Sequence, residues 1–215
     1  MIGIPIGLLY ANAAEWAIHK HVLHGAGKKK GHFFNFHWHD HHKAARRNDH
    51  IDPGYQRSLF GWHSQGKEAL SLALLTSTHL PLFPIAPFFV STLVYSAFRY
   101  HYVHRKAHLD EDWARENLPW HYDHHMAPDQ EANWCVTKPW FDHIMGTRKP
   151  YVGTEREKRD RERRLAVKAR RAARAAMKAG VALAEAKLDA EAREQARQNT
   201  RPQGNSSAGA APAAV

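Results

Sequence analysis

The sequence predicts an all-α protein with a membrane-embedded helical domain, a basic C-terminal helix and a disordered tail. Three observations lead to this fold class. The 18 histidines in 215 residues fall in clusters with helical spacing. The main apolar stretch, residues 69–98, is interrupted by three prolines. After residue 154 the composition turns to Ala, Arg, Glu and Lys, which are strong helix formers.

The apolar segments predict a helical hairpin that enters a membrane. Residues 1–18 are mostly apolar, and residues 69–98 contain Pro81, Pro84 and Pro87, which mark a turn. The halves on either side of this turn are shorter than the roughly 20 apolar residues of a spanning helix. We therefore expect a hairpin that returns to the side it left. A buried core hairpin of a soluble protein is the alternative.

A returning hairpin would place the polar zones before and after it on one side of the membrane. Basic residues such as Lys28–Lys30, Arg46 and Arg105 share that side, so the positive-inside tendency makes it cytoplasmic. No cleavable signal peptide is evident at the start. Cys135 is the only cysteine, which excludes an intrachain disulfide and a thiolate metal cluster. We predict an integral membrane protein with its polar zones in the cytoplasm.

Three regions follow from the change in composition. They are a membrane domain over residues 1–154, a charged Ala-rich helix over residues 155–200 and a disordered tail over residues 201–215. Basic clusters can bind nucleic-acid phosphates. Because the charges are mixed up to Arg164, a solvated helix is favoured, with contact to anionic lipid second. We expect no nucleic-acid partner.

Four histidine clusters flank the apolar segments, and each has the spacing of a metal-binding motif. Residues three or four apart lie on one face of a helix and can direct two imidazoles to one place. Residues five apart diverge by about 140°, so His19 and His24 require a helix end or a distortion. His37 and His39 are alternatives in the second cluster, and His101 could replace His104 in the third. The candidate ligands are His19, His24, His37, His39, His41, His42, His104, His108, His121, His124 and His125.

Ten neutral nitrogen ligands suit two borderline transition metals, such as iron or zinc, and neither magnesium nor calcium. Metal-bound imidazoles need acceptors for their second nitrogen. Candidates for this role lie within or near the clusters, although capping or solvated aspartates are an equal alternative. These candidates are Asp40, Asp110, Asp123, Asp142 and Asn133.

The motifs resemble those of the fatty acid hydroxylase/sterol desaturase superfamily of membrane di-metal enzymes, over roughly residues 10–150. The segment 133–147 resembles the closing signature of that family. Two departures are Trp38, inside a motif that is usually HX2HH, and Cys135, where the family usually has glycine. The matching motifs are His19-Lys-His-Val-Leu-His24, Phe36-His-Trp-His-Asp-His-His42, His104-Arg-Lys-Ala-His108 and His121-Tyr-Asp-His-His125.

The resemblance implies O2-dependent hydroxylation or desaturation of a lipid-like substrate, which could be a fatty acyl chain, a sterol or a carotenoid. It implies two iron ions, with zinc as a possible substitute. Since no cytochrome b5-like domain is fused to the chain, a separate ferredoxin or cytochrome would supply electrons. The alternative is a non-catalytic membrane metal-binding protein, whose sites would be exposed and loosely arranged.

Overall fold

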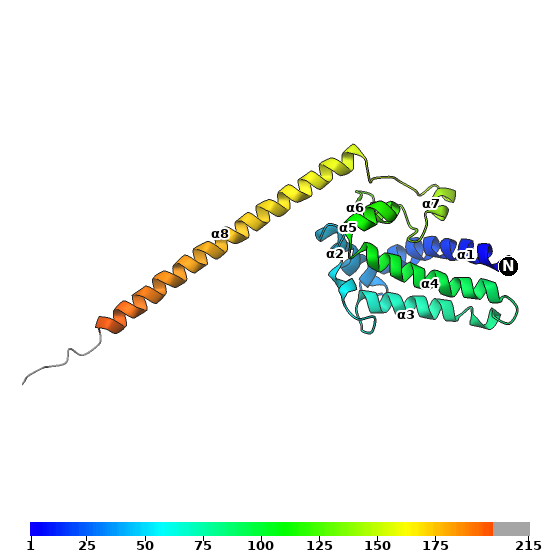
Figure 1. Ribbon diagram of the computed structural model, residues 1–215, viewed down its shortest axis with the longest axis horizontal. Helices are drawn as coiled ribbons and strands as arrows, with labels where there is room; N and C mark the ends of the chain where they lie inside the picture. Colours follow the sequence, from blue (N-terminus) through cyan, green and yellow to red (C-terminus); the bar gives the residue numbers. More distant parts are fainter. Residues whose placement is uncertain (200–215) are drawn as a thin grey trace, which may run out of the picture. The chain divides into compact units, whose positions relative to one another are not determined.

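The computed structural model describes residues 1–199, and within them it contains helices and no strand, which confirms the all-α prediction (Figure 1). The predicted tail, 201–215, lies outside the described residues. The longer helices are α1 (Gly3–Ile18), α3 (Ser64–Ser77), α4 (Pro87–Ala107) and α8 (Glu155–Asn199). The shorter α-helices are α2 (Lys43–Arg47), α5 (Glu111–Asn117), α6 (Pro119–Met126) and α7 (Trp140–Ile144). Two π-helical turns are η1 (His19–Gly25) and η3 (His37–His42), and three 3-10 turns are η2 (Ala26–Lys28), η4 (Pro53–Gln56) and η5 (Leu80–Leu82).

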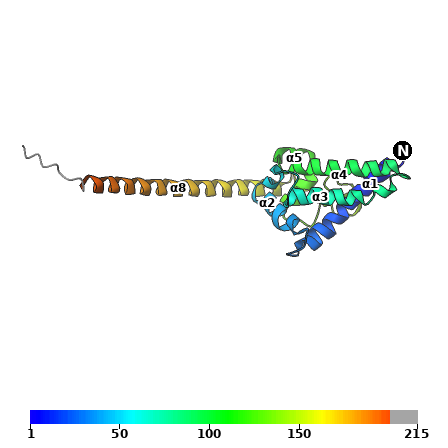
Figure 2. The same cartoon turned by 90° about the horizontal axis from the view of Figure 1, so that it is seen from below.

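Helices α1, α3 and α4 form a bundle, and they lie side by side in both views (Figures 1 and 2). α1 and α4 run parallel and in close contact, because glycines of α1 face the backbone and side chains of α4. A Cβ atom on Gly3 would lie 2.7 Å from the backbone nitrogen of Phe89, and one on Gly7 would lie 2.8 Å from Cβ of Thr92. These glycines set the spacing of the two helices.

The predicted hairpin is present as α3 and α4, joined by a proline-containing turn. Pro81 lies in η5, and Pro87 opens α4 at the first-turn position where its missing N–H costs nothing. α4 is longer than the apolar segment and continues through His104 to Ala107. Within residues 1–199, no helix has both the length and the apolar composition needed to cross a bilayer.

The two ends of the bundle differ in chemistry. At one end, the start of α1 lies beside the turn between α3 and α4 (Figures 1 and 2). This end exposes large apolar side chains, among them Met1, Ile2, Ile6, Phe83, Ile85 and Phe88. The opposite end, where α1 and α4 finish, carries the histidine clusters.

The compact histidine-bearing unit extends through Lys158, slightly beyond the boundary that the composition suggested. The physical reason is Glu157, whose buried carboxylate accepts hydrogen bonds from Arg115 and from the backbone N–H of Gly153. The second unit begins at Arg159, where α8 continues as a charged helix. Along residues 165–197 the side chains of this helix are exposed.

Candidate metal centre

The structure gathers histidines from all four motifs into two buried groups. We call the first group site A. Its ligand atoms lie within 4.8 Å of one another, and its members are His19, His24, His37, His42 and His124. We call the second group site B. It combines two overlapping sets that share His108, and its members are His41, His50, His104, His108, His121 and His125.

Two π-helical turns explain how site A is assembled from irregular spacings. The wider π-helical turn brings residues five apart closer to one face than an α-helix does. η1 therefore brings His19 and His24 together, which is the distortion that the sequence required. η3 does the same for His37 and His42, whose Nε2 atoms lie 3.2 Å apart.

Adjacent histidines are divided between the two sites. His42 and His124 belong to site A, whereas their neighbours His41 and His125 belong to site B. The ring centroids of His42 in site A and His125 in site B lie 4.2 Å apart, so the two sites are directly adjacent. The paired motifs thus build two neighbouring positions instead of one crowded position.

The structure also separates the alternatives that the spacing left open. His37 is buried in site A, while His39 lies outside both groups and bonds through Nε2 to the carbonyl of Lys28. His104 is fully buried in site B. His101, one turn earlier on α4, lies outside the groups and bonds to Glu68.

In site A, four outer nitrogens are held by oxygen acceptors. Nδ1 of His19 donates to the carbonyl of Trp134 at 2.6 Å, and Nδ1 of His124 donates to that of Ala132 at 2.7 Å. Side chains hold the other two: His42 Nδ1 lies 3.0 Å from Gln130 Oε1, and His24 Nδ1 lies 3.4 Å from Glu131 Oε1. These acceptors fix the ring orientation and direct Nε2 inward.

In site B, two carboxylates and a carbonyl hold three of the six histidines in the same way. His41 Nδ1 donates to Asp52 at 2.8 Å, and His104 Nδ1 donates to Glu68 at 2.7 Å. His108 Nδ1 donates to the carbonyl of His50 at 2.8 Å. Glu68 also accepts hydrogen bonds from Tyr55 and His101, so it anchors three side chains at once.

The inward nitrogens fit a metal cation. A neutral imidazole has one N–H, and in His24, His42 and His124 that hydrogen is used at Nδ1. Their Nε2 lone pairs then face one another at 3.0–3.2 Å. In site B, Nε2 of His41 and His104 has no partner among the described residues. A buried acceptor without a donor lowers the stability of the folded protein, and a cation bound between these nitrogens would remove that penalty.

Burial favours the neutral form of several site imidazoles by lowering their pKa values. Desolvation lowers the pKa of His19 to about 3 and holds the pKa values of His42, His124 and His125 well below the ordinary value. The neighbouring imidazoles lower the last three further. Neutral imidazole is the form that binds a metal, so no proton has to be displaced at pH 7.

None of the second-nitrogen candidates from the sequence bonds to a site histidine within the described part of the chain. Asp142 accepts from the backbone of Trp134 and Cys135, and Asp110 caps α5. Asp40 is exposed. Asp123 and Asn133 both bond to Arg148. These contacts agree with the alternative of capping or solvated side chains, and none of them orients a site histidine.

The residues that do orient ligands carry no signal in the sequence. Asp52, Glu68 and Gln130 belong to none of the histidine motifs, and only the fold brings them to the sites. His50 was missed because no second histidine stands three or four residues away. It is fully buried, its ring stacks on that of His108 at 4.5 Å, and Nδ1 bonds to the carbonyl of Ala107.

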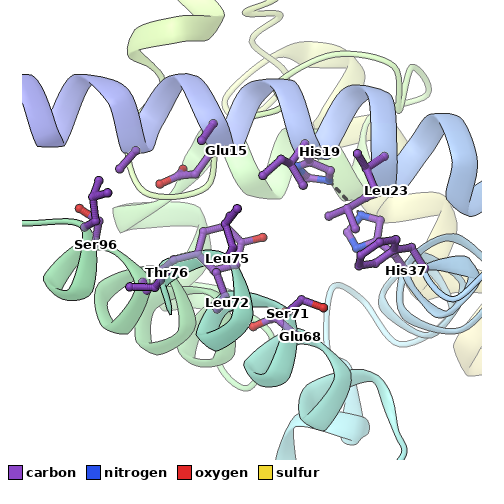
Figure 3. A pocket seen from close by; sticks show the side chains of 18 of the residues that line it. Glu15, His19, Leu23, His37, Glu68, Ser71, Leu72, Leu75, Thr76 and Ser96 are labelled. Carbon is purple, nitrogen blue, oxygen red and sulfur yellow. Dashed lines mark hydrogen bonds between the residues drawn. The ribbon is translucent and has the colours of Figure 1, made fainter. Parts of the chain in front are cut away.

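An apolar pocket of about 350 Å³ adjoins site A, with walls from α1, α3 and α4 (Figure 3). His19 and His37 reach one part of it, and Tyr10 and His79 line another. Its polar side chains include Glu15 and Glu68, which project from facing helices. Burial raises the pKa of Glu15 to about 7, although hydrogen bonds from Thr137 and Val136 oppose that rise.

The arrangement can hold metal ions in nitrogen sites beside a space suited to hydrocarbon. The candidate ligands are buried imidazoles, most of them oriented by an oxygen acceptor, and one site borders the pocket directly. Searches with this chain match no protein family, no curated protein and no solved structure.

Proposed function

We propose that this protein is an O2-dependent oxygenase that hydroxylates or desaturates a lipid-like substrate with two iron ions held in sites A and B. The observation that carries the proposal is the contact between site A and the pocket, where His19 and His37 are both ligand candidates and pocket walls. Iron bound there would supply O2 activation. The chain itself contributes neutral ligands, their orientation and a cavity with few polar groups. The motif resemblance to the fatty acid hydroxylase/sterol desaturase superfamily supports the same reaction class.

The pocket suits an extended hydrocarbon. Along α1 and into the first residue of η1, the lining runs from Tyr10 to His19, which corresponds to about 14 Å at 1.5 Å per residue. Leu72, Leu75 and Leu93 provide apolar walls along this length. A chain or ring that fills the pocket would bring a C–H bond to the site A end.

The charges around the pocket favour an uncharged substrate end. The described residues that line it include Glu15 and Glu68 but no lysine or arginine. A carboxylate or phosphate headgroup inside would therefore lack a cationic partner and meet two acidic side chains. We infer that the hydrocarbon end enters and that any anionic headgroup stays outside.

We propose that the apolar end of the bundle is inserted in a membrane, with the metal sites on the cytoplasmic side. The support is the run of large exposed side chains at the α3–α4 turn, where Ile85 is 81% exposed, together with the start of α1, where Ile2 is 78% exposed. Tyr10 and His79 line the pocket near this end. Lipid could then pass from the bilayer to the pocket without crossing water.

The membrane proposal is tested by flotation with vesicles. The double change Phe83→Asp and Ile85→Asp should release the protein from neutral vesicles, because it places charge in the apolar end. Leu183→Asp with Leu188→Asp, on exposed positions of α8, is the control and should float like the parent protein. Equal flotation of all three proteins would reject this mode of attachment.

A non-catalytic metal-binding protein is the rival function. It would need the histidine sites but no adjoining hydrocarbon pocket, so the pocket favours the oxygenase.

The decisive experiment supplies iron-loaded protein with O2, a reductant and membrane lipid extract. We expect a product that carries one more oxygen, or two fewer hydrogens, than its precursor. The His125→Ala variant should form none. Iron-loaded, folded protein that consumes no O2 with any lipid class, yet releases its metal readily to a chelator, would identify a metal carrier instead.

A further inference from the structure

We propose that an acidic one-electron donor protein docks over Lys28 and Trp38, and that the indole of Trp38 carries the electron to site A. The inference rests on the proposed oxygenase function, because that reaction consumes two electrons for each O2. It adds the entry point, which the sequence did not assign.

Trp38 connects the surface to two site A histidines. Its ring lies 4.9 Å from that of His24 and 5.3 Å from that of His42 between centroids. Nζ of Lys28 lies 4.6 Å from the centroid of the same ring. The indole is partly buried, so one aromatic side chain spans from an exposed lysine to the ligands.

Site A is thereby approached from two separate sides. His19 and His37 face the substrate pocket, while His24 and His42 face Trp38. Trp38 does not line the pocket. A donor protein at Trp38 would not compete with lipid, so both can be bound during turnover.

The charge around Trp38 selects an acidic partner. Lys28, Lys29 and Lys30 are consecutive and exposed at the end of η2, and Lys43 is exposed directly after η3. η2 and η3, the turns that these lysines belong to or follow, pack against each other. Lys28 also forms an ion pair with Glu131, whose carboxylate bonds to Nδ1 of the site A histidine His24. A partner that binds Lys28 would therefore lie one side chain away from a metal ligand. Complementary charge speeds such encounters and makes them sensitive to salt.

The electron balance requires two encounters for each product. Each encounter oxidises one reduced donor by one electron. Two electrons and two protons, with one O2, convert a C–H bond to C–OH and release one water. The donor class is a one-electron carrier with an acidic surface, such as a plant-type ferredoxin.

The docking surface is tested first without catalysis, in zinc-loaded protein. The probe is an acidic plant-type ferredoxin, and its affinity is measured by calorimetry at low and high salt. Reversal of the basic run (Lys28→Glu, Lys29→Glu, Lys30→Glu) should weaken binding at least tenfold at low salt. The control reverses three cations of α8 (Arg170→Glu, Arg171→Glu, Arg174→Glu) and should leave the affinity unchanged.

The electron path is tested in iron-loaded protein by stopped flow. Trp38→Leu should slow reduction by ferredoxin at least tenfold, while reduction by dithionite and the iron content stay at parent values. Trp38→Phe, which keeps an aromatic ring, should lie between the two. These readouts need no lipid substrate, so they can succeed or fail independently of the proposed function.

Two results would overturn the inference. One is ferredoxin reduction of Trp38→Leu at the parent rate. The other is ferredoxin binding that is unaffected by the Lys28–Lys30 reversal. If that reversal instead abolishes binding to anionic vesicles and leaves ferredoxin binding intact, the basic surface is a membrane contact and the donor docks elsewhere.

Discussion

At the scale of single residues, the two ring nitrogens of most site histidines have different roles. In eight of the eleven site histidines, Nδ1 bonds to a fixed oxygen and leaves Nε2 for the site. Loss of a metal ligand and loss of its hydrogen-bond acceptor can therefore be tested in separate variants, with control substitutions taken from the same motifs.

Removing His125 should reduce bound metal from two equivalents toward one and abolish turnover. It is fully buried in site B, where its ligand atom lies within 4.8 Å of those of His41, His104 and His108. His39→Ala is the matched control, because His39 belongs to the second motif but lies outside both groups. Elemental analysis and turnover assays measure both effects. Full metal content in folded His125→Ala protein would contradict its assignment.

Removing an acceptor should weaken metal binding without removing a ligand. Asp52→Ala leaves Nδ1 of His41 without its partner, and loss of such a partner typically costs about 10–100-fold in metal affinity. Asp40→Ala, an exposed aspartate beside the same ligand, should have no effect. Competition with a chelator of known affinity measures both. Equal affinities would show that Asp52 does not support site B.

These residues mark the limit of what the sequence could predict at this scale. Ligand spacing is local, so the motifs identified the histidines of both sites apart from His50. Acceptors are set by tertiary contacts: Gln130 meets His42 across 88 positions of the chain. Proximity in sequence favoured Asp40 and Asp123, which bond to no site histidine.

At the scale of helices, the close approach of α1 and α4 depends on glycine. Gly7→Ala should destabilise the protein by about 1–3 kcal/mol, because the added carbon meets Thr92 in a well-packed contact. Gly180→Ala is the matched control in α8, where nothing lies within 4 Å. It should raise local helix stability by about 1 kcal/mol. Urea unfolding measures the first change and thermal loss of helical ellipticity the second. A stabilised Gly7→Ala protein would show that the contact is looser than described.

Helix types could be predicted only in part. The proline cluster correctly placed the hairpin turn, because proline cannot continue a helix. The spacing of His104 and His108 indicated a helical face in the third motif, but it did not predict that this segment continues the hairpin helix α4 without a break. The π-helical turns were anticipated only as an unspecified distortion at His19 and His24.

At the scale of the whole molecule, metal-free protein should be sensitive to acid. Burial lowers the folded-state pKa of His19 and His50 to about 3, and the other neutral imidazoles are shifted in the same direction. In the unfolded chain these groups bind protons below about pH 6.5. Their stabilising effect is therefore present above that pH and is lost as the pH falls toward the folded values. Each contributes a loss of about 1.4 kcal/mol per pH unit.

Urea midpoints of chelator-treated protein at pH 7.5, 6.5 and 5.5 measure this effect. We expect a steep fall below pH 6.5, since several such groups together exceed the roughly 5–15 kcal/mol stability of a domain. The raised pKa of Glu15 acts in the opposite direction, but it is a single group. A midpoint that is independent of pH would show that the histidines are not buried without metal.

The two units of the chain should be separable, but only at the boundary that Glu157 sets. Protein ending at Lys158 should keep its metal content and turnover. Protein ending at Thr154 loses the partner of Arg115, and we expect it to be less stable by about 1–3 kcal/mol. Chemical unfolding and metal analysis of both truncations test this. Loss of turnover in the longer one would assign α8 a catalytic role.

The division of site A between distant segments has a consequence for how the protein is made. His24 and His124 are 100 positions apart, yet their Nε2 atoms lie 3.2 Å from each other. At about 5–20 residues per second, a ribosome needs roughly 5–20 seconds to pass from one to the other. Throughout that interval the first two motifs are present without their partners from the fourth. Site A is therefore complete only after the nascent chain has passed His124, and a metal bound earlier would be held by fewer ligands.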